Sequence, residues 1–390
     1  MLKVWITIFV VIFLFVIFMS YFSVSAKADT ETIGVSAQSA VLYCVNNDTV
    51  LFEKNSNKKM SMASTTKILT TLIALEHSQA EDKEVTFTKE MIAEGSSMYL
   101  KEGYKLHLSD LATGMMTVSG NDAANAVAIS ISGSIEEFSK VMNSKAQQIG
   151  MTSSSFVTPS GLDDENHYST ALDMAHLMAY AMSNNSFAEL TAKKNARVDF
   201  ISPEDMSITY GNHNRLLSLY EYCNGGKTGF TKKSGRCLVT SAEKDGVKLI
   251  AVTLNAPDDW NDHINMYNYG FSKVTAVTDV DKNYTINTDV VGGTENSVAI
   301  KPVKAIDYVK PADSNIEVTR KVIIDSFLYA PIEKGEVVGT AQYYLDNKLL
   351  CEVPLVTTTN VEYKTVEKGF FESIAEFFKK LNCNNKLNTF

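Results

Sequence analysis

Three short motifs in the sequence combine side chains that could together transfer an acyl group. The first is Ser64-Thr-Thr-Lys67, at the start of an apolar segment with helical spacing. Side chains three residues apart on a helix share a face, so the serine hydroxyl and the lysine amine can meet. A serine becomes a nucleophile when a nearby base accepts its proton, and an uncharged lysine can be that base. Ser64 is therefore a candidate nucleophile and Lys67 its candidate base.

This pattern alone is weak evidence, since a structural helix start would look the same. Ser56-Asn-Lys-Lys59 and Ser241-Ala-Glu-Lys244 match it too, the first in a polar turn and the second where a strand runs into a turn. Only the Ser64 copy opens a helix, where the field of the helix N-terminus favours developing negative charge.

The second motif, Ser119-Gly-Asn121, lies on a predicted tight loop before a helix of small residues. A hydroxyl and an amide in such a loop can relay a proton and hold a substrate carbonyl, whereas a helix cap is the structural alternative. Ser183-Asn-Asn185 shows the same pattern, so the specificity of this motif is low.

The third motif, Lys227-Thr-Gly229, occurs once, on a predicted strand that enters a hairpin. A lysine and the Thr228 hydroxyl together suit a carboxylate, and Gly229 lets another backbone approach closely. Beside Lys67, the charge of Lys227 would lower the pKa of Lys67 and keep it neutral enough to act as a base. A glycine-rich turn with a solvated lysine is the structural alternative.

The three motifs together, in this order, form the set found in penicillin-binding proteins and related β-lactamases. The flanking residues narrow the match. The segments 62–70, 119–124, 158–163, 167–171 and 226–239 resemble the serine-type D-alanyl-D-alanine carboxypeptidases, the low-molecular-weight penicillin-binding proteins of a peptidase S11-like family. The resemblance covers about residues 33–275 closely and the remainder more loosely.

This resemblance implies acyl transfer from peptidoglycan pentapeptide stems that end in D-Ala-D-Ala. Ser64 would attack the penultimate carbonyl while Lys67 takes its proton, and the backbone N–H groups of Ser64 and Phe230 would form the oxyanion hole. Ser119 would pass a proton to the departing D-Ala, and Asn121 would help orient the substrate. Water would then hydrolyse the acyl-enzyme, and β-lactams would acylate Ser64 as covalent inhibitors.

The remaining implied roles concern binding and support. Lys227, Thr228 and Gly229 would hold the terminal carboxylate, and His167 would fix a loop rather than act as a base. No cofactor, metal or nucleic acid is expected. Residues 258–263 depart from the pattern of the family, which leaves open whether a further basic residue helps bind the carboxylate.

Two alternatives remain open. A class A-like β-lactamase has S-D-N where this chain has Ser119-Gly-Asn121, and the acids Asp163-Asp-Glu165 lack the context expected of its deacylating glutamate. A non-catalytic wall-binding scaffold with a decayed site is the other alternative, although all the motif residues are intact.

The elements around the motifs predict an α/β (α+β) catalytic domain over residues 29–278. Asn46-Asn47-Asp48 and Asp245-Gly246 each separate two strand-like runs, which is typical of hairpins. Helical patterns lie between them, over residues 68–75, 105–150 and 170–195. We expect an antiparallel sheet covered by helices, and the resemblance implies that this is the penicillin-binding-protein/β-lactamase-like transpeptidase fold.

Two further regions follow the catalytic domain. Short β-type runs over residues 279–366 predict a small all-β domain. In the tail, residues 367–390, four phenylalanines share one helical face with Ile374 and Leu381. This amphipathic pattern favours a helix on a membrane surface, and the alternative is a helix docked on the β domain.

The N-terminus predicts export. A basic start, an apolar run over residues 4–19 and Ala26-Lys27-Ala28 are typical of a signal peptide, residues 1–28, and an uncleaved anchor is the alternative. Either way the rest would be exported, and the resemblance implies a location at the outer face of the bacterial cytoplasmic membrane or in the cell wall.

Composition excludes several other classes of protein. With 45% hydrophobic residues, 21% charged residues and a net charge of −9, the 390-residue chain is neither disordered nor a coiled coil, and it is not basic like most nucleic-acid binders. Five cysteines at irregular spacing are no disulfide scaffold. We expect free buried thiols, with a Cys223–Cys237 bridge as the alternative.

Overall fold

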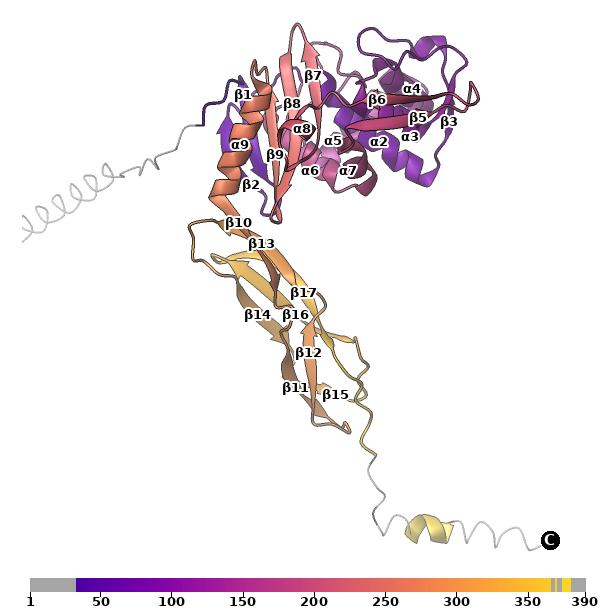
Figure 1. Ribbon diagram of the computed structural model, residues 1–390. Helices are drawn as coiled ribbons and strands as arrows, with labels where there is room; N and C mark the ends of the chain where they lie inside the picture. Colours follow the sequence, from indigo (N-terminus) through magenta and orange to yellow (C-terminus); the bar gives the residue numbers. More distant parts are fainter. Residues whose placement is uncertain (1–32, 366–368, 370–373, 380–390) are drawn as a thin grey trace, which may run out of the picture. The chain divides into compact units, whose positions relative to one another are not determined.

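A domain of helices and strands followed by an all-β domain makes up most of this computed structural model (Figure 1), which confirms the predicted fold class. The structure describes residues 33–365, 369 and 374–379. The expected signal peptide and most of the expected tail lie outside the described residues. Among the residues that are described, none of the helices combines the length and the apolar character needed to span a membrane.

A five-stranded antiparallel sheet forms the centre of the first domain. Its strands lie in the order β2 (Thr49–Lys54), β1 (Ser39–Cys44), β9 (Val247–Leu254), β8 (Gly235–Lys244) and β7 (Cys223–Thr231). The two predicted hairpins join β1 to β2 and β8 to β9. Nearly all of β9 is buried, as expected for a short, continuous apolar strand that is covered on both faces.

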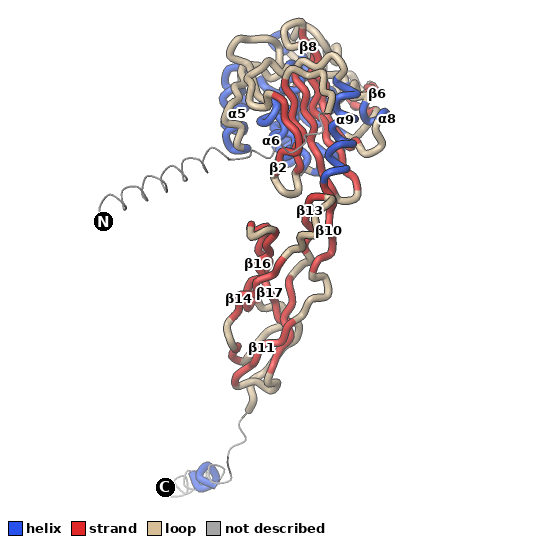
Figure 2. The backbone as a smooth tube through the Cα atoms, turned by 90° about the vertical axis from the view of Figure 1, so that its left-hand side faces the viewer, coloured by secondary structure: helices blue, strands red, loops and turns tan. Residues whose placement is uncertain are grey.

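Helices cover both faces of this sheet (Figure 2). On one face lies α9 (Asp259–Lys273), where a Cβ at Gly270 would come within 2.7 Å of Leu42 and Leu249 side-chain atoms. On the other face lies α6 (Ala171–Met182), which packs against Ile250 and Val252. The remaining helical elements are η1 (Ala63–Thr66), α2 (Lys67–Ala80), η2 (Lys89–Met91), α3 (Leu108–Thr117), α4 (Asn121–Ser132), α5 (Ile135–Ile149), α7 (Asn185–Thr191) and α8 (Leu216–Leu219). Two small two-stranded sheets pair β3 (Glu84–Thr86) with β4 (Lys105–His107), and β5 (Asn195–Asp199) with β6 (Ser207–Gly211).

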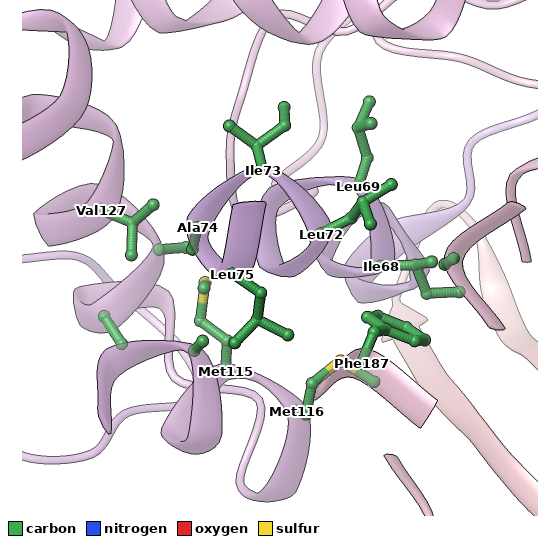
Figure 3. Close-up of a cluster of buried hydrophobic side chains, with 14 of the residues drawn as sticks. Ile68, Leu69, Leu72, Ile73, Ala74, Leu75, Met115, Met116, Val127 and Phe187 are labelled. Carbon is green, nitrogen blue, oxygen red and sulfur yellow. The ribbon is translucent and has the colours of Figure 1, made fainter. Parts of the chain in front are cut away.

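The central helix is α2, in which every residue from Lys67 to Leu75 is buried. A helix buried on all sides has to be enclosed by other elements. Its apolar side chains pack among Met115 and Met116 of α3, Val127 of α4 and Phe187 of α7 (Figure 3). Each such burial stabilises the fold by about 1.5–3 kcal/mol, so the position of the Ser64–Lys67 turn is set by the core.

The second domain is built from strands. The end of α9 continues directly into β10 (Val274–Val280), which pairs with β13 (Ile306–Pro311). A second sheet has the order β14 (Thr319–Ile324), β16 (Val337–Leu345), β17 (Lys348–Thr357), β12 (Ser297–Pro302), β11 (Ile286–Val291) and β15 (Phe327–Tyr329). The boundary expected at residues 278 and 279 falls within β10, and we propose Val274 as the first residue of this domain.

The described cysteines are free thiols. Cys44, Cys223 and Cys237 are buried and Cys351 is half-buried, so the Cys223–Cys237 bridge that the sequence left open is not formed. Cys383 lies outside the described residues.

Candidate active site

Residues from all three motifs line a single cleft with a volume of 290 Å³. Ser64 lies in η1, Ser119 on the loop between α3 and α4, and Thr228 on β7, the edge strand of the main sheet. Gly229 of the third motif and Phe230, the residue after it, also line the cleft, whereas Lys67, Asn121 and Lys227 are buried. The structure therefore brings together all the residues that the sequence singled out for chemistry.

The Lys67 amine is the centre of a buried hydrogen-bond network. Its Nζ lies 2.9 Å from Ser64 Oγ, 2.6 Å from Asn121 Oδ1 and 2.7 Å from the Ser160 carbonyl oxygen. A protonated amine donates to all three groups, whereas a neutral amine has a lone pair free to accept from the Ser64 hydroxyl. The arrangement can therefore move a proton between Ser64 and Lys67.

Burial and charge favour the neutral form of this amine. Burial lowers the pKa of Lys67 well below its ordinary value, and the charge of Lys227 lowers it further against the opposing effect of Asp122. Burial also lowers the pKa of Lys227, to about 7. Two buried amines that repel each other favour a state in which only one is charged.

Close backbone approach around Ser64 depends on two glycines. A Cβ at Gly229 would lie 2.9 Å from the Met62 carbonyl oxygen and 3.1 Å from the Ser64 backbone nitrogen. The backbone of β7 thus passes beside the Ser64 amide, where two N–H groups can face one oxyanion. A Cβ at Gly161 would lie 1.9 Å from the Ala63 carbonyl oxygen, so Gly161 supports the turn that presents Ser64.

Replacing Gly161 with alanine should therefore destabilise the first domain and slow acylation. Gly161 has a φ of +84° and Gly133 a φ of +82°, but no atom lies within 4 Å of a Cβ at Gly133. Gly133→Ala is a matched control, since both variants place alanine in the left-handed region. We expect Gly161→Ala to lower the free energy of unfolding by about 1–3 kcal/mol more than Gly133→Ala. Urea unfolding measures the difference, and equal losses would contradict the steric explanation.

The loop that carries Ser119 and Asn121 is held by contacts with residues outside the three motifs. Asn121 donates from Nδ2 to the Glu94 carbonyl oxygen at 2.6 Å. The buried Asp122 carboxylate accepts hydrogen bonds from Ser97 Oγ at 2.6 Å, Met98 N at 2.9 Å and Leu100 N at 3.1 Å. These bonds fix the segment that carries Ser96 along the cleft.

His167 is buried and does not line the cleft. Its Nδ1 accepts from the N–H groups of Val157 at 3.1 Å and Thr158 at 3.3 Å, so Nε2 carries the hydrogen and donates to Thr66 Oγ1 at 2.8 Å. Burial lowers the pKa of His167 to about 4. A neutral imidazole in this position connects a loop to η1.

The chain is similar in sequence and structure to known proteins. Residues 24–258 match the family model of the D-alanyl-D-alanine carboxypeptidases, peptidase S11, and residues 275–363 match the model of the penicillin-binding protein 5 C-terminal domain. The chain is 32% identical over 354 residues to the D-alanyl-D-alanine carboxypeptidase DacF of Bacillus subtilis (strain 168), covering 87% of this chain and 90% of that one. It is also 32% identical over 371 residues to DacC of Escherichia coli (strain K12), covering 90% of each. Penicillin binding protein 5 from Haemophilus influenzae is similar in structure, with a TM-score of 0.64, 29% identity and coverage of 84% of this chain and 98% of that one.

Proposed function

Since this chain belongs to the D-alanyl-D-alanine carboxypeptidase family, peptidase S11, we propose that Ser64 is its nucleophile and Lys67 its general base. The protein is a serine-type D-Ala-D-Ala carboxypeptidase and a penicillin-binding protein. The observation that best supports the two residue roles is the 2.9 Å contact between Lys67 Nζ and Ser64 Oγ at the cleft.

Acylation begins when Ser64 Oγ attacks the carbonyl carbon of the penultimate D-Ala while Lys67 Nζ takes the hydroxyl proton. The tetrahedral oxyanion lies between the backbone N–H groups of Ser64 and Phe230. One such donor typically contributes roughly 3–4 kcal/mol to catalysis. The proximity of Gly229 to the Ser64 amide supports this assignment.

Departure of D-Ala requires a proton on its nitrogen. Ser119 Oγ passes that proton from Lys67 to the leaving amine, and Asn121, which already contacts Lys67, orients the substrate. Lys227, Thr228 and Gly229 hold the terminal carboxylate. Water then hydrolyses the ester at Ser64 and restores the free enzyme.

Penicillins acylate the same Ser64 hydroxyl, and this reaction separates the proposal from its alternatives. We expect a fluorescent penicillin to label the mature protein in a one-to-one ratio. A scaffold with a decayed site would not label, and a β-lactamase would turn the penicillin over rapidly. The comparisons do not favour either alternative.

The pH dependence of acylation tests the coupling between the two lysines. Lys67 must be neutral to accept a proton, so acylation rises with pH as Lys67 deprotonates. After burial, the charge of Lys227 is the next cause that lowers the Lys67 pKa. In Lys227→Gln the acidic limb of the acylation rate should therefore move to higher pH. Thr228→Val, which alters the carboxylate site without removing a charge, should leave that limb in place; an unmoved limb in Lys227→Gln contradicts the coupling.

We place the enzyme outside the cytoplasmic membrane, held there by its tail. Residues 1–28 have the pattern of a signal peptide, and the substrate is part of the cell wall. Residues 374–379 are helical, with Phe377 and Phe378 exposed by 63% and 61%.

A chain that ends at Lys364 should therefore sediment with anionic vesicles less than the full mature chain does. The reason is that apolar side chains on an interfacial helix bury their surface in the bilayer. Replacing Phe377 and Phe378 with alanine in the full chain should give an intermediate result. Equal sedimentation of the shortened and full chains would show that the tail is not the anchor.

A further inference from the structure

Four large apolar side chains are exposed at one end of the second domain. Val291 ends β11, and Phe327 and Tyr329 belong to β15, the edge strand that pairs with β11 in parallel (Figure 1). Tyr363 forms a bridge with Gly293, two residues after Val291. Val291, Phe327, Tyr329 and Tyr363 are exposed by 46%, 43%, 68% and 64%, and together they are the end patch.

The two aromatic rings of β15 lie on the outer face of the sheet. Side chains alternate between the two faces of a strand, and Leu328, between the two rings, packs against the domain core that contains Val290. Phe327 and Tyr329 therefore point away from that core. Their rings contact edge to face with centroids 5.3 Å apart, and Tyr329 is directly opposite Val291. The core does not need these side chains, and an exposed apolar patch on an edge strand favours association with another surface.

The chain leaves the second domain beside the end patch. The Lys364 backbone N–H donates to the Gly292 carbonyl oxygen at 2.8 Å, which fixes the last residues before the tail next to the end of β11. Ile374, the first residue of the helical segment 374–379, follows Thr365 by nine positions. A tail helix on a membrane surface would therefore keep the end patch within about 30 Å of that surface, because an extended chain spans at most about 3.6 Å per residue.

Acidic and basic residues both border the end patch. Asp289 is directly opposite Phe327, Glu362 and Lys364 flank Tyr363 in the sequence, and all three charged side chains are exposed. With both signs present, binding to the end patch would depend on apolar contact rather than on net charge. Phenyl and phenol rings suit the headgroup region of a bilayer, which accommodates an apolar body together with a polar tip.

We propose that the end patch inserts into the headgroup region of the membrane as a second contact beside the tail. This inference rests on the proposed placement of the tail at the membrane and extends it. Two weak contacts on one chain bind far more tightly than either alone, because the first holds the second at a high effective concentration. The second contact also orients the second domain on the membrane, which a single point of attachment cannot do.

A tryptophan placed in the end patch would report its surroundings. The chain has two tryptophans, Trp5 in the expected signal peptide and Trp260 in the first domain, so only Trp260 contributes background in the mature chain. Phe327→Trp places the reporter in the end patch. Leu349→Trp is the matched control, because Leu349 is 44% exposed in the same domain but lies near the start of β17, whose other end leads toward Tyr363.

With vesicles of phosphatidylcholine and phosphatidylglycerol, the added emission of Phe327→Trp should shift to shorter wavelength. Brominated lipids should quench it at least about threefold more than the added emission of Leu349→Trp. High salt should not remove this difference, because apolar contact is not screened. Equal, weak quenching of both reporters would contradict the inference. A shift that occurs without vesicles and grows with protein concentration would contradict it too, because a second copy of the chain would then cover the end patch.

Removing both rings measures what they contribute. The double variant Phe327→Ser, Tyr329→Ser of the full mature chain should bind vesicles about 10-fold more weakly, whereas Leu349→Ser should stay within about threefold of the wild type. Both should release D-alanine as the wild type does, and thermal unfolding shows whether each is folded. Unchanged vesicle binding by the double variant would contradict the inference.

The proposals made above can fail separately from this one. If the chain that ends at Lys364 sediments as well as the full chain, the tail is not the anchor, and quenching of Phe327→Trp still decides whether the end patch contacts the membrane. Release of D-alanine by the wild type tests the enzymatic activity without vesicles.

Discussion

Ser64→Ala is expected to abolish release of D-alanine from diacetyl-Lys-D-Ala-D-Ala. Without the hydroxyl no acyl-enzyme can form, so kcat/KM should fall roughly 10⁴-fold or more. Labelling by a fluorescent penicillin should be lost in the same variant, because it depends on the same oxygen. The side chain is small and lies at the cleft surface, so the variant should fold.

The sequence supplies its own controls for this variant. Ser56 and Ser241 begin the two other S-x-x-K copies, and neither lines the cleft. Ser56→Ala and Ser241→Ala should both keep activity within about threefold of the wild type, in the range of substitutions away from the reacting groups. Activity that survives Ser64→Ala but not one of these controls would mean that the nucleophile has been misassigned. A wild type that turns over penicillin rapidly without releasing D-alanine would be a β-lactamase.

The second large effect is expected for Lys67. Lys67→Arg keeps a positive charge, but an arginine cannot lose its proton at neutral pH. Lys67→Met has neither the charge nor the base. Because general-base catalysis typically contributes 10²- to 10⁴-fold, both variants should acylate more slowly by about that factor. Stopped-flow measurement of acylation by a fluorescent penicillin gives the rate.

These two variants separate a base from a merely electrostatic group. If Lys67 served only as a positive charge, Lys67→Arg would stay active. Lys244→Met changes the lysine of another S-x-x-K copy and should leave the acylation rate unchanged. Since Lys67 is buried within the core, thermal unfolding has to show that each variant is native before its rate is compared.

Local chemistry made the main sheet partly predictable. The β1–β2 and β8–β9 turns contain residues with positive φ, Asp48 at +55°, Asp245 at +49° and Gly246 at +81°, and such residues leave a turn signal in the sequence. The pairing of β1 with β9 could not be predicted in this way. It pairs residues more than two hundred positions apart, such as Ser39 with Leu254, and no local pattern encodes that pairing. The β5–β6 pair was not predicted although both strands alternate polar and apolar residues, because each strand is short and residues 200–206 between them form no tight two-residue turn.

The parts of the site that depend on the type of side chain could be predicted from the sequence. The parts that depend on backbone position or strand register could not. Ser64 and Lys67 belong to the S-x-x-K motif and Lys227 to the K-T-G motif, and both motifs are visible in the sequence. The Ser160 carbonyl oxygen that accepts from Lys67 is a backbone atom. Every residue has such an atom, so the sequence gives no sign of which one contacts Lys67. Arg236 enters the cleft only through its register with Phe230, and a one-residue slip would turn it to the other face.

The burial of α2 has a consequence for when the enzyme becomes active. The helix that begins with Lys67 is also the helix around which the core closes, so Lys67 becomes buried and contacts Asn121 and the Ser160 carbonyl oxygen only when packing is complete. A chain exported in an unfolded state would be inactive during export and would gain activity in the step that completes folding. Penicillin labelling would then count native molecules, and its time course after export would report the maturation of the protein in the living cell.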